Sequence, residues 1–288
     1  MDLFKGFRRK SKGEVVTHVI VSLIFFVVAI SYIYILVWAF LAGLKTHTEV
    51  VDNPFGLPKE WHWKNYFEVF RLFEVNGKNF LDMLFNSIWF SMGGVVLQQF
   101  VTMTFAYCCS KYKFPGSTIP FVLILFMSSL PIYGSSGALY ILLHNWGLID
   151  SYAQILVSAS GFSIPFLFYT AFFQNLSWTF AEAAMIDGAN DFSIYFRVFL
   201  PQTMPIFTAL CLTNGIAAWN SYESALIYLP NLPTLPVGIY QFNVEMLYRA
   251  RLDILFAACV LVALPAIILL IAFNKTITTN VSLGGIKG

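Results

Sequence analysis

The residues best suited to binding chemistry lie in one short stretch after the middle of the chain. Glu182 starts an alanine-rich run, and Asp187 precedes Gly188. Glutamate and alanine favour helix, whereas glycine takes a positive φ at low cost and can end a helix. Asn190 or Asp191 can cap the next helix. We therefore expect two short helices at an angle, joined by a glycine turn, with small alanines that let a partner approach closely.

Two interpretations are open for the carboxylate of Glu182. A negative charge near the start of a helix is stabilised by the helix dipole. The same charge can also make a charge-assisted hydrogen bond to another protein. The second predicted helix carries apolar positions from 192 to 200, and we expect Pro201 to end it and Pro205 to stand at the entry to the next helix.

No pattern typical of an enzyme accompanies this stretch. The sequence has no Gly-x-x-x-x-Gly-Lys-Ser/Thr loop and no Ser/His/Asp or Cys/His arrangement for nucleophilic catalysis. The four histidines are scattered, and the four cysteines lack metal-ligand spacing. Those cysteines are Cys108, Cys109, Cys211 and Cys259. We expect a chain without catalytic residues, a metal or a nucleotide site of its own.

The composition indicates an integral membrane protein. Of the 288 residues, 58% are hydrophobic and only 11% are charged, and the mean hydropathy is +0.71. A soluble domain carries about 25% charged residues, so this chain has too little polar surface to cover a water-soluble globule. The net charge of +2 gives no sign of a nucleic-acid partner.

Seven stretches without charged residues are candidates for membrane crossing, since a spanning helix needs about 20 mostly apolar residues. One of them, 224–244, contains Pro230, Pro233 and Pro236, so we expect an extracytoplasmic loop there. The first apolar run exceeds the roughly 7–15 residues of a signal peptide core and is expected to be a retained anchor. The six predicted spans are 17–42, 84–107, 118–143, 151–173, 205–228 and 254–273.

The distribution of Lys and Arg predicts the orientation. With the N-terminus inside, ten of these residues lie on the inner face and seven on the outer face, so both termini are expected in the cytoplasm. Residues 1–16 are then a cytoplasmic segment, and 17–288 form one transmembrane domain. That domain has an outer loop at 43–82 and an inner segment at 174–204, which contains the Glu182 run.

The inner segment resembles the EAA motif of binding-protein-dependent ABC importer permeases. That motif has Glu-Ala-Ala, two residues, Asp-Gly-Ala, and then a Phe and a Leu-Pro. The matching residues are Glu182, Ala183, Ala184, Asp187, Gly188, Ala189, Phe196, Leu200 and Pro201. The resemblance implies coupling helices that dock in a cleft of an ATPase subunit.

Further similarities extend over nearly the whole chain and narrow the branch to the carbohydrate group, namely the second permease of maltose-type transporters. The segment 114–116 is similar to the first inner loop of that group, and 234–238 to an outer loop. The end of the chain, with Gly284, Lys287 and Gly288, is similar to its cytoplasmic Gly-x-x-Lys-Gly tail.

The resemblance implies an all-α membrane protein with six transmembrane helices and the ABC importer permease fold. It implies a second, homologous permease as a heterodimer partner and a dimeric ATPase on the cytoplasmic face, which binds ATP and Mg. It also implies an extracellular or periplasmic solute-binding protein and a place in the bacterial plasma membrane. No cofactor is expected in this chain.

A sugar is recognised by groups that hydrogen-bond its hydroxyls and by aromatic faces. The candidates for the substrate path are Tyr133, Tyr140, Trp219, Asn220, Tyr222 and Glu223. Helix packing or an aromatic belt at the membrane interface is the alternative for these residues. The group often has Trp-Asn-Asp where this chain has 219–223, so a cargo of sugar or oligosaccharide and one of glycerol-phosphate or another polyol both stay open. An ion-coupled secondary transporter is the rival class.

Overall fold

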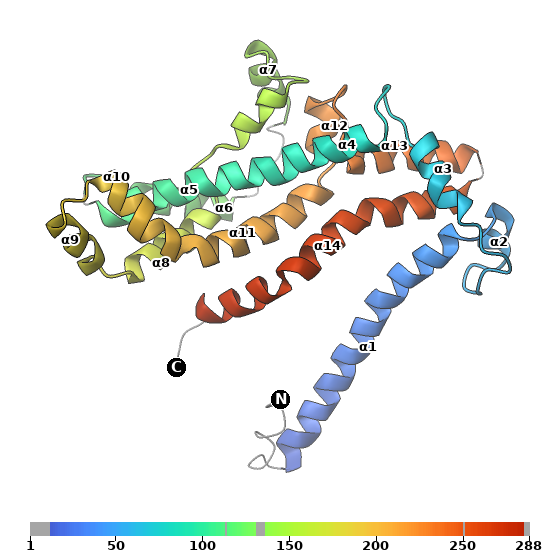
Figure 1. Cartoon of the computed structure of the whole chain (residues 1–288), viewed down its shortest axis with the longest axis horizontal. Coiled ribbons are helices and arrows are strands. Elements are labelled where there is room, and N and C mark those ends of the chain that lie inside the picture. The colour runs from blue at the N-terminus through green and yellow to red at the C-terminus, as the bar shows by residue number, and fades with distance from the viewer. Residues whose placement is uncertain (1–11, 113, 131–135, 250, 285–288) are drawn as a thin grey trace. The chain divides into compact units, whose positions relative to one another are not determined.

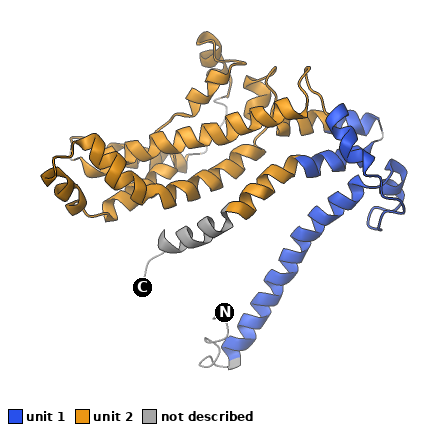
Figure 2. Cartoon of the chain, in the orientation of Figure 1, with its two compact units in different colours: residues 1–72, 243–261 blue, residues 73–242, 262–288 orange. Residues whose placement is uncertain are grey.

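The computed structural model describes residues 12–112, 114–130, 136–249 and 251–284, with the side chains in these ranges except at 12 and 273–284. The described residues form helices, turns and loops, and they contain no β-strand. The chain divides into two compact units (Figure 2), one made of 1–72 and 243–261 and the other of 73–242 and 262–288.

Unit 1 contains the first long helix and the segment that follows it. Helix α1 spans Lys12–Gly43, α2 spans His47–Asp52 and α3 spans Lys64–Leu72 (Figure 1). No residue of the most apolar window of α1 is buried within the chain. A helix that is apolar on all sides is typical of a membrane span. At its end, a Cβ on Gly43 would lie 3.0 Å from the backbone of Ala257, so a larger residue would press the two packed backbones apart.

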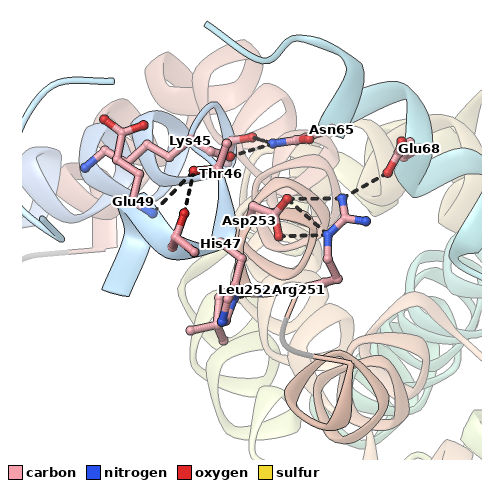
Figure 3. A network of polar contacts seen from close by, with 11 residues as sticks. Lys45, Thr46, His47, Glu49, Asn65, Glu68, Arg251, Leu252 and Asp253 are labelled. Carbon is pink, nitrogen blue, oxygen red and sulfur yellow. Dashed lines mark hydrogen bonds and ion pairs between the residues drawn. The ribbon is translucent and has the colours of Figure 1, made fainter. Parts of the chain in front are cut away.

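A polar network in unit 1 joins α3 to the end of α1 and to the segment around Arg251 (Figure 3). The Asn65 side-chain amide donates to the backbone carbonyl of Gly43 at 2.9 Å. The guanidinium of Arg251 donates from Nε to Asp253 at 3.1 Å and from Nη2 to Glu68 at 3.0 Å. Asp253 is only 4% exposed, and its hydrogen bonds with Arg251 raise the pKa of the guanidinium. The buried carboxylate of Asp253 is thus paired with a cation at the start of helix α14 (Leu252–Gly284).

Unit 2 is organised around one continuous helix from Phe80 to Lys111. It consists of α4 (Phe80–Ser87), the π-helical turn η2 (Ile88–Gly93) and α5 (Gly94–Lys111). Asn79 begins it with a capping box: its side chain accepts from the backbone N–H of Asp82, whose carboxylate accepts from the N–H of Asn79. This exchange satisfies donors that have no partner inside the helix.

The other elements of unit 2 are shorter. They are α6 (Ile119–Ser129), α7 (Ser136–Asn145), the 3₁₀ helix η3 (Tyr152–Ser158), α8 (Pro165–Asn175), α9 (Thr179–Ile186), α10 (Asp191–Ile194), the π-helical turn η4 (Tyr195–Phe199), α11 (Leu200–Asn220) and α12 (Glu223–Tyr228). Helix α5 packs along α8 and α11. Two further helices, α13 (Leu235–Tyr248) and α14 (Leu252–Gly284), contribute residues to both units.

Three of the predicted spans are continuous helices. Within the described residues, three helices are long and apolar enough to cross a membrane: Gly13–Gly43, Phe80–Lys111 and Leu252–Ala272. They cover the predicted spans at 17–42, 84–107 and 254–273.

The other three predicted spans are not single helices. Span 118–143 is broken after α6, where Leu130 is extended (ψ 124°), as expected for a residue before Pro131. Span 151–173 begins as the 3₁₀ helix η3 and becomes α-helical only at Pro165. Span 205–228 is divided at Ser221, which is extended between α11 and α12.

The segment 224–244, predicted as a loop, has helix at both ends, because α12 and most of α13 lie there. Between the two helices, 229–234 is not helical. Pro236 occupies the second position of α13, where a proline lacks no required donor. Pro230 and Pro233 lie in the connection between the two helices, so the prolines mark the ends of helices and do not exclude them.

Candidate functional site

The Glu182 run forms a helix that ends in a tight turn at Gly188. The residue has φ +81°, a backbone conformation that favours glycine. The N–H of Ala189 donates to the carbonyl of Ala184 at 2.9 Å, and the N–H of Gly188 donates to Met185 at 3.0 Å. These two bonds make a Schellman motif, which satisfies the last carbonyls of α9. The predicted glycine turn is therefore present.

The next helix begins at the predicted cap. The Asn190 side chain accepts from the backbone N–H of Ser193 at 2.9 Å. The helix does not end at Pro201, as we expected, but continues through η4 into α11 as far as Asn220. A π-helical turn precedes the proline, and the N–H of Leu200 bonds five residues back to Tyr195. The predicted second short helix is thus the first part of one long helix.

Side chains that follow Pro201 bond back to the preceding turn of the helix. Gln202 donates from its amide to the carbonyl of Val198 at 2.8 Å. Thr203 donates to the carbonyl of Phe199 at 2.8 Å. Pro201 lacks an N–H and follows directly on the π-helical turn, where the regular α-helical bonding is already interrupted.

One face of this element packs into a core that it shares with α5 and α8. Helices α9 and α10 lie at one end of these two helices (Figure 1). The buried residues of that core are Met103, Ala106, Tyr107, Ile124, Phe166, Tyr169, Phe173, Ala181, Ile194, Tyr195 and Phe199. The ring centroid of Tyr107 lies 4.7 Å from that of Tyr195 and 5.2 Å from that of Phe199. Aromatic contacts of this kind add stabilisation beyond simple burial.

The ammonium group of Lys111 contacts the same core. The Nζ of Lys111 donates to the backbone carbonyl of Leu176 at 2.6 Å and lies 5.5 Å from the ring centroid of Phe199. Lys111 is in the last turn of α5, and Leu176 follows α8, so one side chain joins three segments of the chain.

The opposite face of the element is open. The motif residues Glu182, Ala183, Asp187, Gly188, Phe196 and Pro201 are exposed, and Ala184, Ala189 and Leu200 are partly buried. Large apolar side chains lie among them, with Ile186 at 87% and Phe192 at 76% exposure. Beside them is an open hollow of about 460 Å³, lined by Ala184, Asp187, Gly188, Ala189, Asn190, Ser193, Arg197 and Val198. We call this face the coupling face.

The candidate path residues are not gathered at one place. Trp219 is 2% exposed and packs inside unit 2, whereas Asn220 and Glu223 are exposed at the break between α11 and α12. Tyr222 stacks on Tyr240 at 5.1 Å. Tyr140 lies in α7. Tyr133, Lys287 and Gly288 lie outside the described residues, and Gly284 is the last residue of α14.

A cavity that the sequence did not predict lies beside this break. It has a volume of about 320 Å³ and is bordered by α5, η3, α7 and the α11–α12 connection. Its polar lining residues are Ser91, Gln98, Gln154, Ser158, Ser221, Ser224, Tyr228 and Thr234. We call it the polar cavity. Only its position next to 219–223 was within reach of sequence analysis, because the lining residues are far apart in the chain.

The chain is similar in sequence and in structure to known transport proteins. No protein-family model matches the chain. It is 27% identical over 276 residues to the probable ABC transporter permease protein YurM of Bacillus subtilis. The match covers 94% of this chain and 89% of YurM. It is 27% identical over 253 residues to the diacetylchitobiose uptake system permease protein NgcG of Streptomyces coelicolor, with 86% and 82% covered. The chain resembles carbohydrate ABC transporter permeases.

The resemblance to carbohydrate ABC transporter permeases includes a trehalose transport system permease protein, SugB of Mycobacterium tuberculosis. The identity is 25% over 255 residues, with 87% of this chain and 91% of SugB covered. In structure, the chain matches a bacterial ABC transporter involved in the import of the acidic polysaccharide alginate. The TM-score is 0.74 at 22% identity, and the match covers 92% of this chain and 98% of that chain. This likeness shows that the chain has an ABC importer permease fold.

The resemblance inferred from residues 182–201 is confirmed at the level of an ABC transporter permease of the carbohydrate group. The described helices agree with a membrane component of that kind. The roles of individual residues on the coupling face stay predictions.

Proposed function

We propose that the chain is the permease subunit of an ATP-driven, binding-protein-dependent importer, and that it carries a sugar or oligosaccharide by alternating access. The observation that carries the proposal is the coupling face. Its glycine turn, capped helix and exposed apolar side chains stand on a tightly packed aromatic base. A rigid element with an open apolar face is suited to transmit a partner's movement.

The ATPase is a separate subunit in this proposal, and it binds ATP and Mg. Closure of its dimer pushes on α9 and α10, and the contacts of Tyr195, Phe199 and Lys111 pass the movement to α5 and α8. Glu182 supplies a directed charge at the start of this path, in the first turn of α9. The chain itself takes no part in hydrolysis.

The proposed topology has six crossings of the bacterial plasma membrane and both termini in the cytoplasm. Three crossings are the long helices, and the other three combine shorter helices, α6 with α7, η3 with α8, and α11 with α12. Broken crossings of this kind are found in transporters where irregular backbone lies within protein. The coupling face is then cytoplasmic, as the Lys and Arg distribution favours.

The proposed partners are a second, homologous permease, the dimeric ATPase and an extracellular or periplasmic solute-binding protein. The named carbohydrate permeases among the relatives support this assembly and a sugar cargo.

The test is ATP-driven uptake by the reconstituted assembly of the chain with these partners. Uptake should need ATP, should stop with vanadate and should not respond to a collapse of ion gradients. Uptake driven by a proton or sodium gradient without ATP would instead assign the chain to the ion-coupled class.

A further inference from the structure

The polar cavity contains side chains that can form hydrogen bonds but have no partners among the described residues. The Thr234 residue is 4% exposed, and its buried hydroxyl has no hydrogen-bond partner. The side-chain amides of Gln98 and Gln154, which are only partly buried, form no hydrogen bond within the described part of the chain. Buried polar groups are nearly always paired with protein, water or a ligand. The buried hydroxyl of Thr234 therefore indicates a polar occupant, and the two glutamines in the lining offer it further donors and acceptors.

The lining also shows what kind of occupant fits. Among the described residues it contains hydroxyl and amide side chains but no Asp, Glu, Lys, Arg or His. An anion or cation buried there would lose its hydration without gaining a counter-charge, which is costly. A neutral molecule with several hydroxyls can use the donors and acceptors on both sides. The aromatic rings of Phe90 and Tyr228, also in the lining, can cover the C–H faces of a sugar ring.

The size of the cavity limits the occupant further. Small-molecule pockets have volumes of about 300–1,000 Å³. At about 320 Å³ the polar cavity is at the lower end, which suits one ring and not an oligosaccharide. A longer chain could place only one of its residues here.

We propose that the polar cavity binds one neutral sugar ring, held by Thr234, Gln98 and Gln154. The inference rests on the proposed import function and deepens it, because it places a substrate contact inside this subunit. It also selects a neutral sugar over glycerol-phosphate and acidic sugars.

The experiment measures binding of monosaccharides to the purified full chain in lipid nanodiscs, by saturation-transfer NMR and equilibrium dialysis. The probes are D-glucose, D-galactose, D-xylose and L-arabinose, with D-glucuronate as the charged counterpart of glucose. At least one neutral sugar should bind roughly tenfold more tightly than glucuronate, the ratio expected when one buried charge goes unpaired. Equal or tighter binding of glucuronate, or no binding of any neutral sugar, would overturn the proposal.

Two variants locate the site. Thr234→Val and Gln154→Leu keep the size of the side chain and remove its hydrogen bonds, so each should weaken sugar binding by about three- to tenfold. Thr213→Val is the matched control, because Thr213 is exposed on α11 and bonds only to its own helix at Ala209 and Leu210. Unchanged sugar affinity in both cavity variants would contradict the site, whether or not the affinity of the control variant changes.

Folding and transport are measured alongside binding. Thr234→Val removes a buried hydroxyl without a partner, so the variant should keep its helical content and melting temperature. If the wild-type chain docks an ATPase and yet binds none of the neutral sugars, only the cavity proposal fails. If it binds a sugar in the cavity but docks no ATPase, the proposed import function fails and the binding site stands.

Discussion

The hydroxyl oxygen of Tyr195 lies 2.7 Å from that of Thr104, which is 91 positions earlier in the chain. Thr104 donates its own hydrogen to the carbonyl of Phe100 at 2.9 Å, so Tyr195 is the donor in this pair. Burial raises the pKa of Tyr195, which keeps the phenol protonated at any physiological pH. The bond ties the segment after the Gly188 turn directly to α5, and it gives the coupling face a firm connection to the long helix.

Removal of this hydrogen bond should loosen the connection. Tyr195→Phe should lower the free energy of unfolding by about 0.5–1.5 kcal/mol, since the ring contacts stay and only the hydroxyl is lost. Thermal unfolding of the purified chain measures the effect, and a double-mutant cycle with Thr104→Val isolates the pair. Tyr32→Phe, at an exposed position of α1, is the control. Additive effects of the two changes would show that the hydroxyls do not interact.

The Gly188 turn should tolerate side chains according to their backbone preference and not their size. A Cβ at this position would meet no atom within 4 Å, so strain comes only from the φ of +81°. A left-handed conformation costs a residue with a Cβ about 1–2 kcal/mol, and Asn tolerates it best. We expect Gly188→Val to abolish ATP-driven uptake and Gly188→Asn to retain most of it.

The matched control for that series is Gly147, which has φ +66° and an equally open Cβ position in another turn. Gly147→Val introduces the same kind of strain away from the coupling face. Uptake and ATPase stimulation should survive in this variant. Loss of both activities in the two Val variants alike would attribute the effect to general destabilisation.

The exposed apolar side chains of the coupling face should matter for docking and not for the stability of the chain. Ile186→Asp and Phe192→Ser change side chains that are 87% and 76% exposed, so the free energy of unfolding should move by less than about 0.5 kcal/mol. Stimulation of ATP hydrolysis by substrate should fall at least about tenfold, since apolar contacts dominate interface energies. Tyr248→Ser, at an 89% exposed position of α13, should leave stimulation unchanged.

Arg251 and Arg249 provide a contrast between a buried and an exposed ion pair in unit 1. Arg251→Met leaves the carboxylate of Asp253 buried without its partner and should cost about 2–4 kcal/mol of stability. The exposed Arg249 pairs with the partly exposed Glu245 at 2.6 Å, so Arg249→Met should cost less than about 0.5 kcal/mol.

A rescue tests the cause of that difference. Asp253→Asn in the Arg251→Met background removes the unpaired charge and should restore part of the lost stability, as measured by chemical unfolding. Equal losses for the two arginine variants, or no rescue, would mean that the buried carboxylate is not the reason.

The turn and cap of the coupling element were predictable because they depend on local chemistry. A glycine beside Asp187 and the amide of Asn190 act on the backbone within three residues, and both behave as predicted. The continuation of the helix past Pro201 was not predictable in this way. It occurs at a π-helical turn, which a rule about proline alone does not include.

The predicted membrane spans likewise fall into those that sequence composition predicts correctly and those that it does not. The long apolar runs became continuous helices because their composition alone determines them, as in α1. Composition alone did not predict the breaks, because Leu130 and Ser221 are extended within stretches that are apolar enough to cross a membrane. The polar cavity was beyond sequence analysis, because Gln98, Gln154 and Thr234 come from three distant segments.

Site-specific cross-linking can show whether the coupling face contacts the ATPase subunit. A variant without native cysteines would carry Ile186→Cys, Phe192→Cys or, as a control, Tyr248→Cys, in an assembly that hydrolyses ATP. The first two variants should cross-link to the ATPase subunit, in a manner that changes with nucleotide, and the control should not. An active assembly in which neither coupling-face variant reaches the ATPase would contradict the proposed contact.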